Sequence, residues 1–556
     1  MKLIECVPNI SEGRNTDLIN QVVDTIRNDK NVHLLDVDAG FDTNRTVITF
    51  IGEPTSVIVA AFNLIKKAAE LIDMSKHQGE HPRMGATDVC PLIPVKNITI
   101  KECVKYSKDL AKKVSNDLSI PTYLYEYSAT NKERQNLANI RKGEYEGMFE
   151  KIKLKEWKPD YGNSTNNIKS GVTAIGVREF LIAYNVNLNT YDKKIATDIA
   201  LDIREAGRAK RDHNGKILRD KNGKMLKKPG KLKFCKAVGW YIDEYNQAQV
   251  SINLTNYKKT SIHKTFEEVR MQARKRGVRV TGSEIVGLVP LSSLINSGKY
   301  YLRKQNRSTG LPDYDILNIA IKSLGLSDIE TFNINDKIID YRIKNQKKLL
   351  IDNTIKELSN LTSLGTPTPG GGSISALAGS YGNALTAMVA NLSFQKKELK
   401  ENQSDYISIG ENCQKYKDRM LELVDLDTDA YDSVIKAIRL PKKNKNDIKE
   451  RDIAIQKATI HAAEIPLEIL ELAIKSLKAL QKLSQIANLN SISDLGVSLY
   501  LIYASAKGAS MNVLINAKDF NNNLKEKYFD KIEYYDKELE ALFTKINDYI
   551  YRTLND

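Results

Sequence analysis

A chain of 556 residues is too long for a single hydrophobic core, and its length predicts about three domains. Hydrophobic residues make up 41% and charged residues 28%, which is typical of a globular protein and excludes a fibrous or fully disordered chain. No uncharged apolar run reaches the roughly 18 residues that a membrane span needs, and Glu5 and Pro8 interrupt the start where a signal peptide would be apolar. We therefore expect a cytoplasmic protein with no membrane partner.

Short apolar runs alternate with helical patterns through residues 1–180. Strands are predicted at Val32–Val37, Val47–Ile51 and Val89–Ile93. Helices are predicted at Thr16–Asn28, Ser56–Met74 and Ile100–Leu118. A mixed sheet with helices on one face buries such elements, so we expect residues 1–180 to form an α+β subdomain.

The densest group of chemically active side chains lies at Lys76–Cys90. This polar loop precedes a predicted strand and carries His77 and His81, and histidine can take a proton from an amine nucleophile near neutral pH. A metal site is disfavoured, because Gly79 and Pro82 oppose the helix that would point both rings one way. The residues alone leave two interpretations of His81 open: a catalytic base, or a side chain that is hydrogen-bonded in a turn.

The cysteines also argue against a metal or disulfide framework. All five are widely spaced and none forms a C-x-x-C pair: Cys6, Cys90, Cys103, Cys235 and Cys413. We expect them to be small buried side chains in a reducing compartment.

A second set of strands and helices follows. Extended runs are predicted at Glu179–Leu188, Ala237–Ile242, Ala248–Leu254 and Gly277–Thr281, with helices at Lys194–Ala206 and Ile262–Arg276. Residues 181–341 are therefore expected to form a second mixed-sheet α+β subdomain.

Much of the formal net charge of +15 lies in a basic insertion, residues 208–234. Between Arg204 and Lys236 there are thirteen lysines or arginines against three acids. An eight-residue repeat places Asn214-Gly215 and Asn222-Gly223 at turns, which favours hairpins with type I′ turns. Such a segment can bind a polyanion, but it lacks the interleaved aromatic residues that stack on bases, so a solvated excursion is the favoured interpretation and nucleic acid is not an expected partner.

Strand signals end near Asp340, and helical periodicity continues to the C-terminus. Residues 342–352 are predicted to be a linker, and residues 353–556 an all-α domain. The predicted fold class is thus α/β, with two mixed-sheet α+β subdomains followed by an all-α helical domain.

One carboxylate lies among apolar positions of a predicted helix in that domain. Asp427 shares a face with apolar residues that recur at three- to four-residue spacing: Met420, Val424, Tyr431, Val434 and Ile438. Asp425, Asp429 and Asp432 are expected to point elsewhere. Loss of hydration should raise the pKa of Asp427, and the pattern alone allows either a buried hydrogen-bond acceptor or a catalytic acid.

Several long motifs, in order, resemble the glutamate formimidoyltransferase family. They are Glu5–Gly13, Leu35–Gly40, Thr43–Val47, Gly79–Pro91, Ala183–Asn187, Val238–Tyr241 and Gly282–Pro290. In the helical domain, Thr366–Ser375 and Leu423–Tyr431 are similar to the cyclodeaminase domain that bifunctional members carry, a fold also seen in methenyltetrahydrofolate cyclohydrolases. The resemblance covers almost the whole chain.

The resemblance implies that His81 is the catalytic base of formimidoyl transfer. Asp38 would orient that imidazole or hold the cationic amidine, although a strand-end cap is an equally simple role. Arg45 and Arg83 are candidate forks for the carboxylates of the substrate, or structural residues.

The resemblance also implies a folate-binding stretch, which is rich in asparagine in this chain. Its residues are Gly162, Asn163, Ser164, Thr165, Asn166, Asn167, Ile168, Lys169, Ser170 and Gly171. Their small polar side chains suit the donors and acceptors of a pterin, and Lys169 suits a carboxylate.

For the helical domain, the resemblance implies that Asp427 is the acid/base of a cyclodeaminase. The expected reaction moves the formimidoyl group of N-formimidoylglutamate to tetrahydrofolate and then releases ammonia to give 5,10-methenyltetrahydrofolate. Tetrahydrofolate would be a co-substrate, with no tightly bound cofactor, and family members assemble as homo-oligomers. Two alternatives remain: a transferase with a cyclohydrolase-like or inactive helical domain, and a basic nucleic-acid-binding scaffold.

Overall fold

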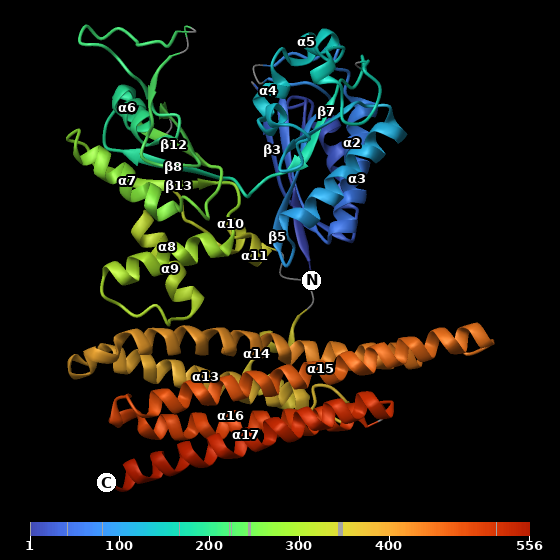
Figure 1. Cartoon of the computed structure of the whole chain (residues 1–556), viewed down its shortest axis with the longest axis vertical. Helices are drawn as coiled ribbons and strands as arrows, with labels where there is room; N and C mark the ends of the chain where they lie inside the picture. The colour runs from blue at the N-terminus through green and yellow to red at the C-terminus, as the bar shows by residue number, and fades with distance from the viewer. Residues whose placement is uncertain are drawn as a thin grey trace. The chain divides into compact units, whose positions relative to one another are not determined.

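The computed structural model describes residues 2–41, 43–79, 82–165, 167–221, 223, 225–242, 246–342, 348–518 and 520–556 (Figure 1). The chain divides into two compact units. The first comprises Met1–Ser297 with Leu324–Lys344, and the second comprises Gly298–Ser323 with Asn345–Asp556. The first unit contains the sheets, and the described part of the second is helical, as the sequence predicted.

The first sheet is mixed and runs in the order β1-β4-β2-β5-β7-β6, with β3 paired to β4. Its strands are β1 (Leu3–Cys6), β2 (Asn9–Ile10), β3 (Val32–Gly40), β4 (Arg45–Gly52), β5 (Thr87–Lys96), β6 (Thr122–Glu126) and β7 (Thr173–Val177). β7 pairs in parallel with β5 and β6, whereas the other pairs are antiparallel.

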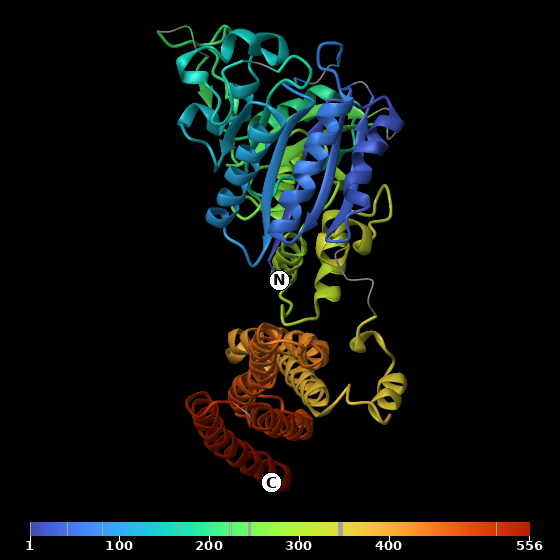
Figure 2. The ribbon, with the colours of Figure 1, turned by 90° about the vertical axis from the view of Figure 1, so that its right-hand side faces the viewer.

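Helices cover one face of this sheet and half of the other. The amphipathic helices α1 (Thr16–Arg27), α2 (Pro54–Leu71) and α3 (Ile100–Leu118) bury their apolar faces on the first face (Figure 2). The short helices α4 (Leu137–Arg141) and α5 (Glu144–Lys151) pack on the second face near β5, β7 and β6. Short 3-10 turns η1 (Lys132–Gln135) and η2 (Lys155–Trp157) flank them. The second face near β4 and β2 is thereby left for a cleft.

The second sheet is antiparallel in the order β11-β12-β8-β13. Its strands are β8 (Ile182–Leu188), β11 (Cys235–Ile242), β12 (Gln247–Leu254) and β13 (Val280–Val286). α6 (Lys193–Ile203) and α7 (Ile262–Arg274) are the helices of this subdomain, and buried apolar residues alternate along β8 and β12 with polar ones. The opposite face of the sheet therefore carries polar side chains.

The basic insertion folds as hairpins, but its first turn is not of the predicted type. β9 (Arg208–Ala209) pairs with β10 (Lys227–Lys228), and Arg211 bridges to Ile217. A type I′ turn needs a positive φ at both central residues. Gly215 has a φ of +79°, but the φ of Asn214 is not positive. Asp212 instead accepts hydrogen bonds from the backbone of Asn214 and Lys216, which builds a longer loop closed by the glycine.

The second unit is built on long helices that lie side by side (Figures 1 and 2). They are α13 (Gly371–Gln395), α14 (Gln403–Ile438), α15 (Lys445–Ser484), α16 (Ile492–Ala517) and α17 (Asn522–Asn555). Its shorter elements are α9 (Asp313–Leu324), η3 (Leu350–Asp352), α12 (Ile355–Thr362), η4 (Lys397–Asn402) and η5 (Leu489–Ser491); α8 (Leu291–Lys304) begins in the first unit, to which α10 (Ile334–Lys337) and α11 (Ile339–Arg342) belong. Small residues of α13, among them Gly379 and Gly382, lie against Met420 and Ile502, which lets the helices approach closely.

Candidate active sites

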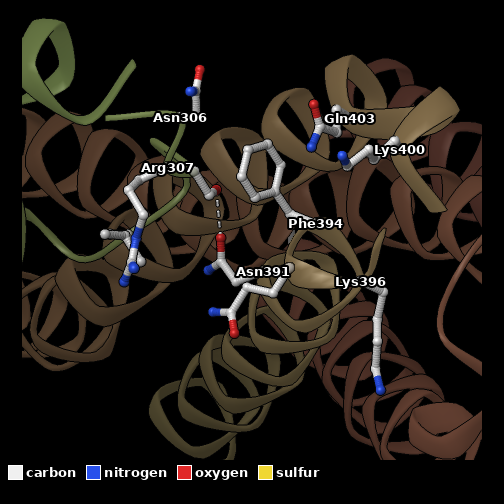
Figure 3. Close-up of a pocket in the computed structure, with 10 residues that line it drawn as sticks. Asn306, Arg307, Asn391, Phe394, Lys396, Lys400 and Gln403 are labelled. Atoms are coloured by element: carbon white, nitrogen blue, oxygen red, sulfur yellow. Dashed lines mark hydrogen bonds between the residues drawn. The ribbon is translucent and has the colours of Figure 1, made fainter. Parts of the chain in front are cut away.

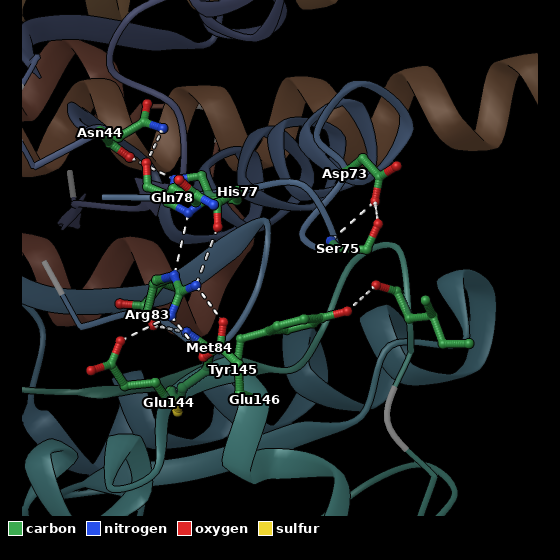
Figure 4. A network of polar contacts seen from close by, with 12 residues as sticks. Asn44, Asp73, Ser75, His77, Gln78, Arg83, Met84, Glu144, Tyr145 and Glu146 are labelled. Carbon is green, nitrogen blue, oxygen red and sulfur yellow. Dashed lines mark hydrogen bonds and ion pairs between the residues drawn. The ribbon is translucent and has the colours of Figure 1, made fainter. Parts of the chain in front are cut away.

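The loop before β5 is held by a network around His77 and Arg83 (Figure 4). His77 Nε2 lies 2.9 Å from the backbone oxygen of Asn44, which can only accept, so Nε2 carries the proton. Its Nδ1 then accepts from Arg83 Nε at 3.3 Å. Burial lowers the pKa of His77, which keeps the imidazole neutral. His77 is therefore a structural hydrogen-bonding residue of this loop.

Arg83 is committed to protein carboxylates. Its guanidinium group lies 2.9 Å from Glu144 Oε2 and 2.6 Å from Glu146 Oε1, at the start of α5. The hydrogen bond with Glu146 is the main reason why the pKa of Arg83 is raised. These pairs tie the loop to α5, and no sequence signal marked the two glutamates as its partners. The predicted role of Arg83 toward a substrate stays a prediction.

The predicted base His81 lies outside the described residues, as does Asn166 of the predicted folate stretch. On the N-terminal side, Gly79 packs against Thr43 and Asn44. Asn44 donates to the backbone oxygen of Gln78 at 2.8 Å and accepts from the backbone N–H of Gly13 at 2.9 Å. Gln78 and Gly79 are thus held against Thr43 and Asn44, in the connection between β3 and β4.

The predicted folate stretch lies beside the histidine loop. Gly171 bridges to Gly85, and Ala86 donates its backbone N–H to the oxygen of Ser170 at 2.8 Å. Asn167 closes the turn by accepting from the backbone of Ser170 at 2.9 Å, and Tyr145 donates to the oxygen of Ile168.

The side chains of that stretch are only partly available to a ligand. Lys169 Nζ donates to the backbone oxygen of Glu70 at 2.7 Å, and Ser170 is buried. Gly162, Asn163 and Thr165 are exposed, and Ser164 is half-buried. The structure therefore brings the two predicted segments together, and direct folate contacts remain a prediction.

Asp38 on β3 and Arg45 at the start of β4 lie in the part of the first sheet that α4 and α5 do not cover. Asp38 is exposed on β3 and pairs in register with Val47 of β4. Burial lowers the pKa of Arg45 to about 10, and the nearby charges of Asp88 and Asp38 oppose that effect. Asp88 in turn pairs with Arg141 and accepts from the backbone N–H of Met84. The predicted residues Asp38 and Arg45 thus lie in one electrostatic cluster with Asp88 and Arg141.

A cleft of about 590 Å³ opens beside this cluster. Residues of both sheets line it, and its positive charges are Arg45, Arg141, Arg178 and Lys236. Glu126 and Glu179 are acids on the same wall, so cations outnumber acids. Such a cleft suits a ligand with several carboxylates. Sequence patterns marked Arg45 alone, because the other cations come from separate segments.

In the second unit, Asp427 lies at the N-terminus of α13. Ser373 Oγ donates to Asp427 Oδ2 at 3.1 Å, and burial raises the pKa of the carboxyl, as expected from the sequence. A Cβ at Gly372 would lie 2.2 Å from Asp427 Oδ1, and one at Gly371 would lie 3.4 Å from Asn512 Nδ2. The missing side chain at Gly372 therefore lets Asp427 approach the start of α13, whereas a Cβ at Gly371 would make only an ordinary contact with Asn512.

One expectation about α14 was wrong. Met420 and Val424 are buried, but Tyr431 and Ile438 are 37% and 45% exposed, because α13 begins beside Val424 and does not extend over the later turns. Asp425, which was expected to point elsewhere than Asp427, accepts from the backbone N–H of Leu350 through its Oδ1 at 2.6 Å. Burial raises the pKa of Asp425 as well.

A second polar pocket, of about 430 Å³, lies on the second unit (Figure 3). Arg307, Lys396 and Lys400 are its cations, and the ring of Phe394 is part of the lining. Asn391 fixes the loop on one side by accepting from Ser308 Oγ at 2.6 Å. This combination suits an anionic ligand with a flat ring.

Cysteines, metal-ligating side chains and apolar helices complete the description. The five cysteines are buried and free, as expected. Among the described residues, no group of three or more histidine, cysteine or acidic side chains is placed to hold a metal ion. None of the described helices combines the length and apolar character of a membrane span.

Comparison with known proteins covers nearly the whole chain. Family profiles match at residues 3–178 (formiminotransferase domain, N-terminal subdomain), 183–344 (formiminotransferase domain) and 354–533 (formiminotransferase-cyclodeaminase). Formimidoyltransferase-cyclodeaminase of Dictyostelium discoideum is 42% identical over 521 residues, which are 93% of each chain.

Shorter relatives match the two halves. Glutamate formimidoyltransferase of Streptococcus pyogenes serotype M1 is 45% identical over 305 residues, 55% of this chain and 95% of that protein. Methenyltetrahydrofolate cyclohydrolase of Methylorubrum extorquens is 32% identical over 204 residues, 36% of this chain and 95% of that protein. Each half thus resembles a protein that exists separately.

Proposed function

The chain belongs to the formimidoyltransferase-cyclodeaminase family, and we propose that it carries out both reactions of that name. It transfers the formimidoyl group of N-formimidoyl-L-glutamate to nitrogen 5 of tetrahydrofolate. It then closes the ring to 5,10-methenyltetrahydrofolate and releases ammonia. Tetrahydrofolate is a co-substrate, and no tightly bound cofactor takes part. The observation that carries this proposal is the family match over both halves of one chain.

In the transfer step, nitrogen 5 of tetrahydrofolate bonds to the amidine carbon and loses its proton to His81. The tetrahedral intermediate then breaks its bond to the glutamate nitrogen, which takes the proton back. The cations of the cleft, Arg45 and Arg141 among them, support this step by binding the carboxylates of the substrates. Asp38 lies in the same charge cluster and would orient the base or the cationic amidine.

In the second step, nitrogen 10 bonds to the same carbon while its proton passes to the imino nitrogen, and the resulting amino group leaves as ammonia. Ammonia leaves only after it has gained a proton, and Asp427 is proposed to supply it. Its burial supports this role, because a raised pKa keeps more of the carboxyl protonated, and so able to donate a proton, as the pH approaches neutrality. Ser373 Oγ lies 3.1 Å from Asp427 Oδ2 and shares its one hydroxyl proton between that oxygen and the backbone oxygen of Val424 at 2.9 Å.

Purified protein with both substrates tests the proposal. We expect equal amounts of glutamate, ammonia and methenyl product, the last followed by its absorbance. A second candidate is a transferase whose helical domain is cyclohydrolase-like, which is favoured by the match to methenyltetrahydrofolate cyclohydrolase. Glutamate release without ammonia would support that candidate and contradict the first.

The folate substrate is proposed to carry a polyglutamate tail. Two cationic regions support this: the cleft with Lys236, and the pocket with Arg307, Lys396 and Lys400 (Figure 3). Added salt should weaken binding of long-tailed folate more than binding of monoglutamate, because each extra carboxylate contributes a screened attraction. Equal salt sensitivity in a titration series would contradict the tail-binding role.

We also propose a cytoplasmic homo-oligomer, with the domain division predicted from the sequence. Exposed apolar side chains on the long helices support assembly. They include Met511 and Ile515 on α16 and Tyr431 on α14. Light scattering at several protein concentrations would measure the assembly, and a monomer at all of them would contradict it.

A further inference from the structure

A row of polar side chains crosses the second sheet. Trp240 on β11 pairs in register with Gln249 on β12, and Gln249 pairs with Asn187 on β8. Glu284 on β13 reaches the same row, since Gln249 Nε2 lies 2.5 Å from Glu284 Oε2 and 2.7 Å from Asn187 Oδ1. Gln249 and Asn187 are each only 1% exposed. Hydrogen bonds within the row offset the cost of burying these polar groups and fix their orientation.

The direction of each hydrogen bond in the row is fixed by Trp240. Its indole Nε1 can only donate, and it lies 2.6 Å from Gln249 Oε1. Gln249 Oε1 therefore accepts, and Gln249 Nε2 donates both to Asn187 and to Glu284. Asn187 Nδ2 is left as a buried donor for which the described residues offer no acceptor. One oxygen of Glu284 is thus held, and the rest of its acceptor capacity remains for a ligand.

Glu284 has the environment of a carboxylate that awaits a positively polarised partner. It is half-buried, and among the described residues no lysine or arginine forms an ion pair with it. The carboxylate can therefore accept further hydrogen bonds from a ligand with N–H donors. Trp240 is 39% exposed, so the row is reached from solvent at that end.

The row faces the same side as the cleft. Lys236 and Trp240 are four residues apart on β11, so their side chains point to the same face of the sheet. Lys236 lines the cleft, and Trp240 lies on the order of 13 Å further along the strand. A ligand of folate size can therefore place its carboxylates at the cations and its other end at the row.

We propose that Glu284 binds a substrate through an N–C–N edge, meaning two nitrogens on one carbon that each present an N–H in the same plane. This inference rests on the proposed function, because both of its substrates have such an edge. The aminopyrimidinone ring of tetrahydrofolate offers N3–H and its 2-amino group, and the protonated formimidoyl group offers two amidine N–H groups. A carboxylate accepts such a pair through two parallel hydrogen bonds. Gln249 is then a positioning residue for Glu284.

Binding of substrate fragments to Glu284→Gln tests the proposal. The variant keeps its shape and still accepts from Gln249, but it turns an amide NH₂ toward the donors of the ligand. The probes for calorimetric titration are 6-methyltetrahydropterin, N-formimidoylglutamate and p-aminobenzoylglutamate, the last of which has no N–C–N edge. We expect a loss of about tenfold or more in affinity for one of the first two, which identifies the source, and none for the third.

Two controls keep the outcome readable. Glu268→Gln makes the same change on α7, where Glu268 bonds to Gln272, and it should bind all three probes as the unmodified protein does. If Glu284→Gln does not fold, the unmodified protein is compared with N-formylglutamate and 2-deamino-6-methyltetrahydropterin, each of which lacks one donor of the edge. One of them must then bind about tenfold more weakly than its parent probe.

Failure of this inference is distinguishable from failure of the proposed function. Unmodified protein that releases neither glutamate nor ammonia contradicts the proposed function. If the unmodified protein is active and Glu284→Gln binds 6-methyltetrahydropterin and N-formimidoylglutamate normally, only the role of Glu284 is contradicted and the proposed function stands. Equal weakening of all three probes shows a structural effect and also overturns the inference.

Discussion

At the scale of single residues, the start of α13 determines how Asp427 is presented. Gly372 allows the carboxylate to approach the helix, and Ser373 donates to it. The apolar stripe made the burial of Asp427 predictable from the sequence, since the buried residues Val424 and Met420 lie about one and two helical turns before it. The partners of Arg83 were not predictable, because Glu144 and Glu146 reach it through the fold and no local pattern links them.

Gly372→Ala should impair the second reaction selectively. The new Cβ would lie 2.2 Å from Asp427 Oδ1, so the carboxylate must move away from the helix. We expect ammonia release to fall at least about tenfold, because a displaced acid transfers its proton poorly, while glutamate release is retained. Gly147→Ala, where a Cβ meets nothing within 4 Å, is the matched control and should leave both reactions unchanged. Equal rates of ammonia release in the two variants would contradict the assignment.

Asp427→Asn should make the protein more stable at neutral pH. Burial raises the pKa of this carboxyl in the folded state, so the folded protein binds the proton more tightly than the unfolded chain does. Ionised Asp427 therefore lowers the free energy of unfolding, and this penalty grows as the pH rises from about 4, the ordinary carboxyl value, through the raised pKa. Denaturant titrations at several pH values should show a gain for the variant at pH 7 that shrinks toward pH 4. A gain that does not change with pH would contradict the raised pKa.

At the scale of elements, length and periodicity decided what was predictable. The helices α1, α2, α3, α6 and α7 and the strands β3, β4 and β5 were expected close to their observed positions, because their apolar residues recur with a clear period. β1, β6 and β7 were missed: they are only four or five residues long and nearly every position is buried, so no alternation marks them. β13 runs over Val280–Val286, whereas the strand was predicted at Gly277–Thr281, because Ser283 and Glu284 interrupt the apolar run that would have marked its second half.

The basic insertion is an element that the fold should tolerate losing. Its base is held by the ion pairs of Arg208 with Asp198 and Asp202 and by backbone bonds such as Leu232 N–H to Ile203 O, whereas the distal residues 210–227 extend beyond the short β9–β10 pair. Replacing residues 210–227 by a short glycine-containing turn should leave glutamate and ammonia release with monoglutamyl folate unchanged, and should weaken retention on heparin because most of the local positive charge is removed. Loss of folate turnover together with loss of heparin binding would contradict the view that the insertion is separate from catalysis.

At the scale of the whole molecule, the sequence revealed the two chemistries but not the shape of either site. The cations of the cleft lie on β4, on α4, after β7 and on β11, so only the fold brings Arg45, Arg141, Arg178 and Lys236 together. The helical unit is similar: Asp427, Gly372 and Asn512 come from three helices that meet at one end of α13. Local sequence patterns indicated Arg45 in the first group and Asp427 in the second, and only tertiary packing brings the other residues beside them.

We propose that His81 and Asp427 each move protons in successive reactions on one single-carbon unit. The direct test follows glutamate and ammonia release together in His81→Ala and in Asp427→Asn. We predict that His81→Ala loses glutamate release by about a hundredfold or more, and that Asp427→Asn releases glutamate normally while ammonia release falls by a similar factor. Variants that each keep the unmodified rate of the step assigned to them would contradict the account.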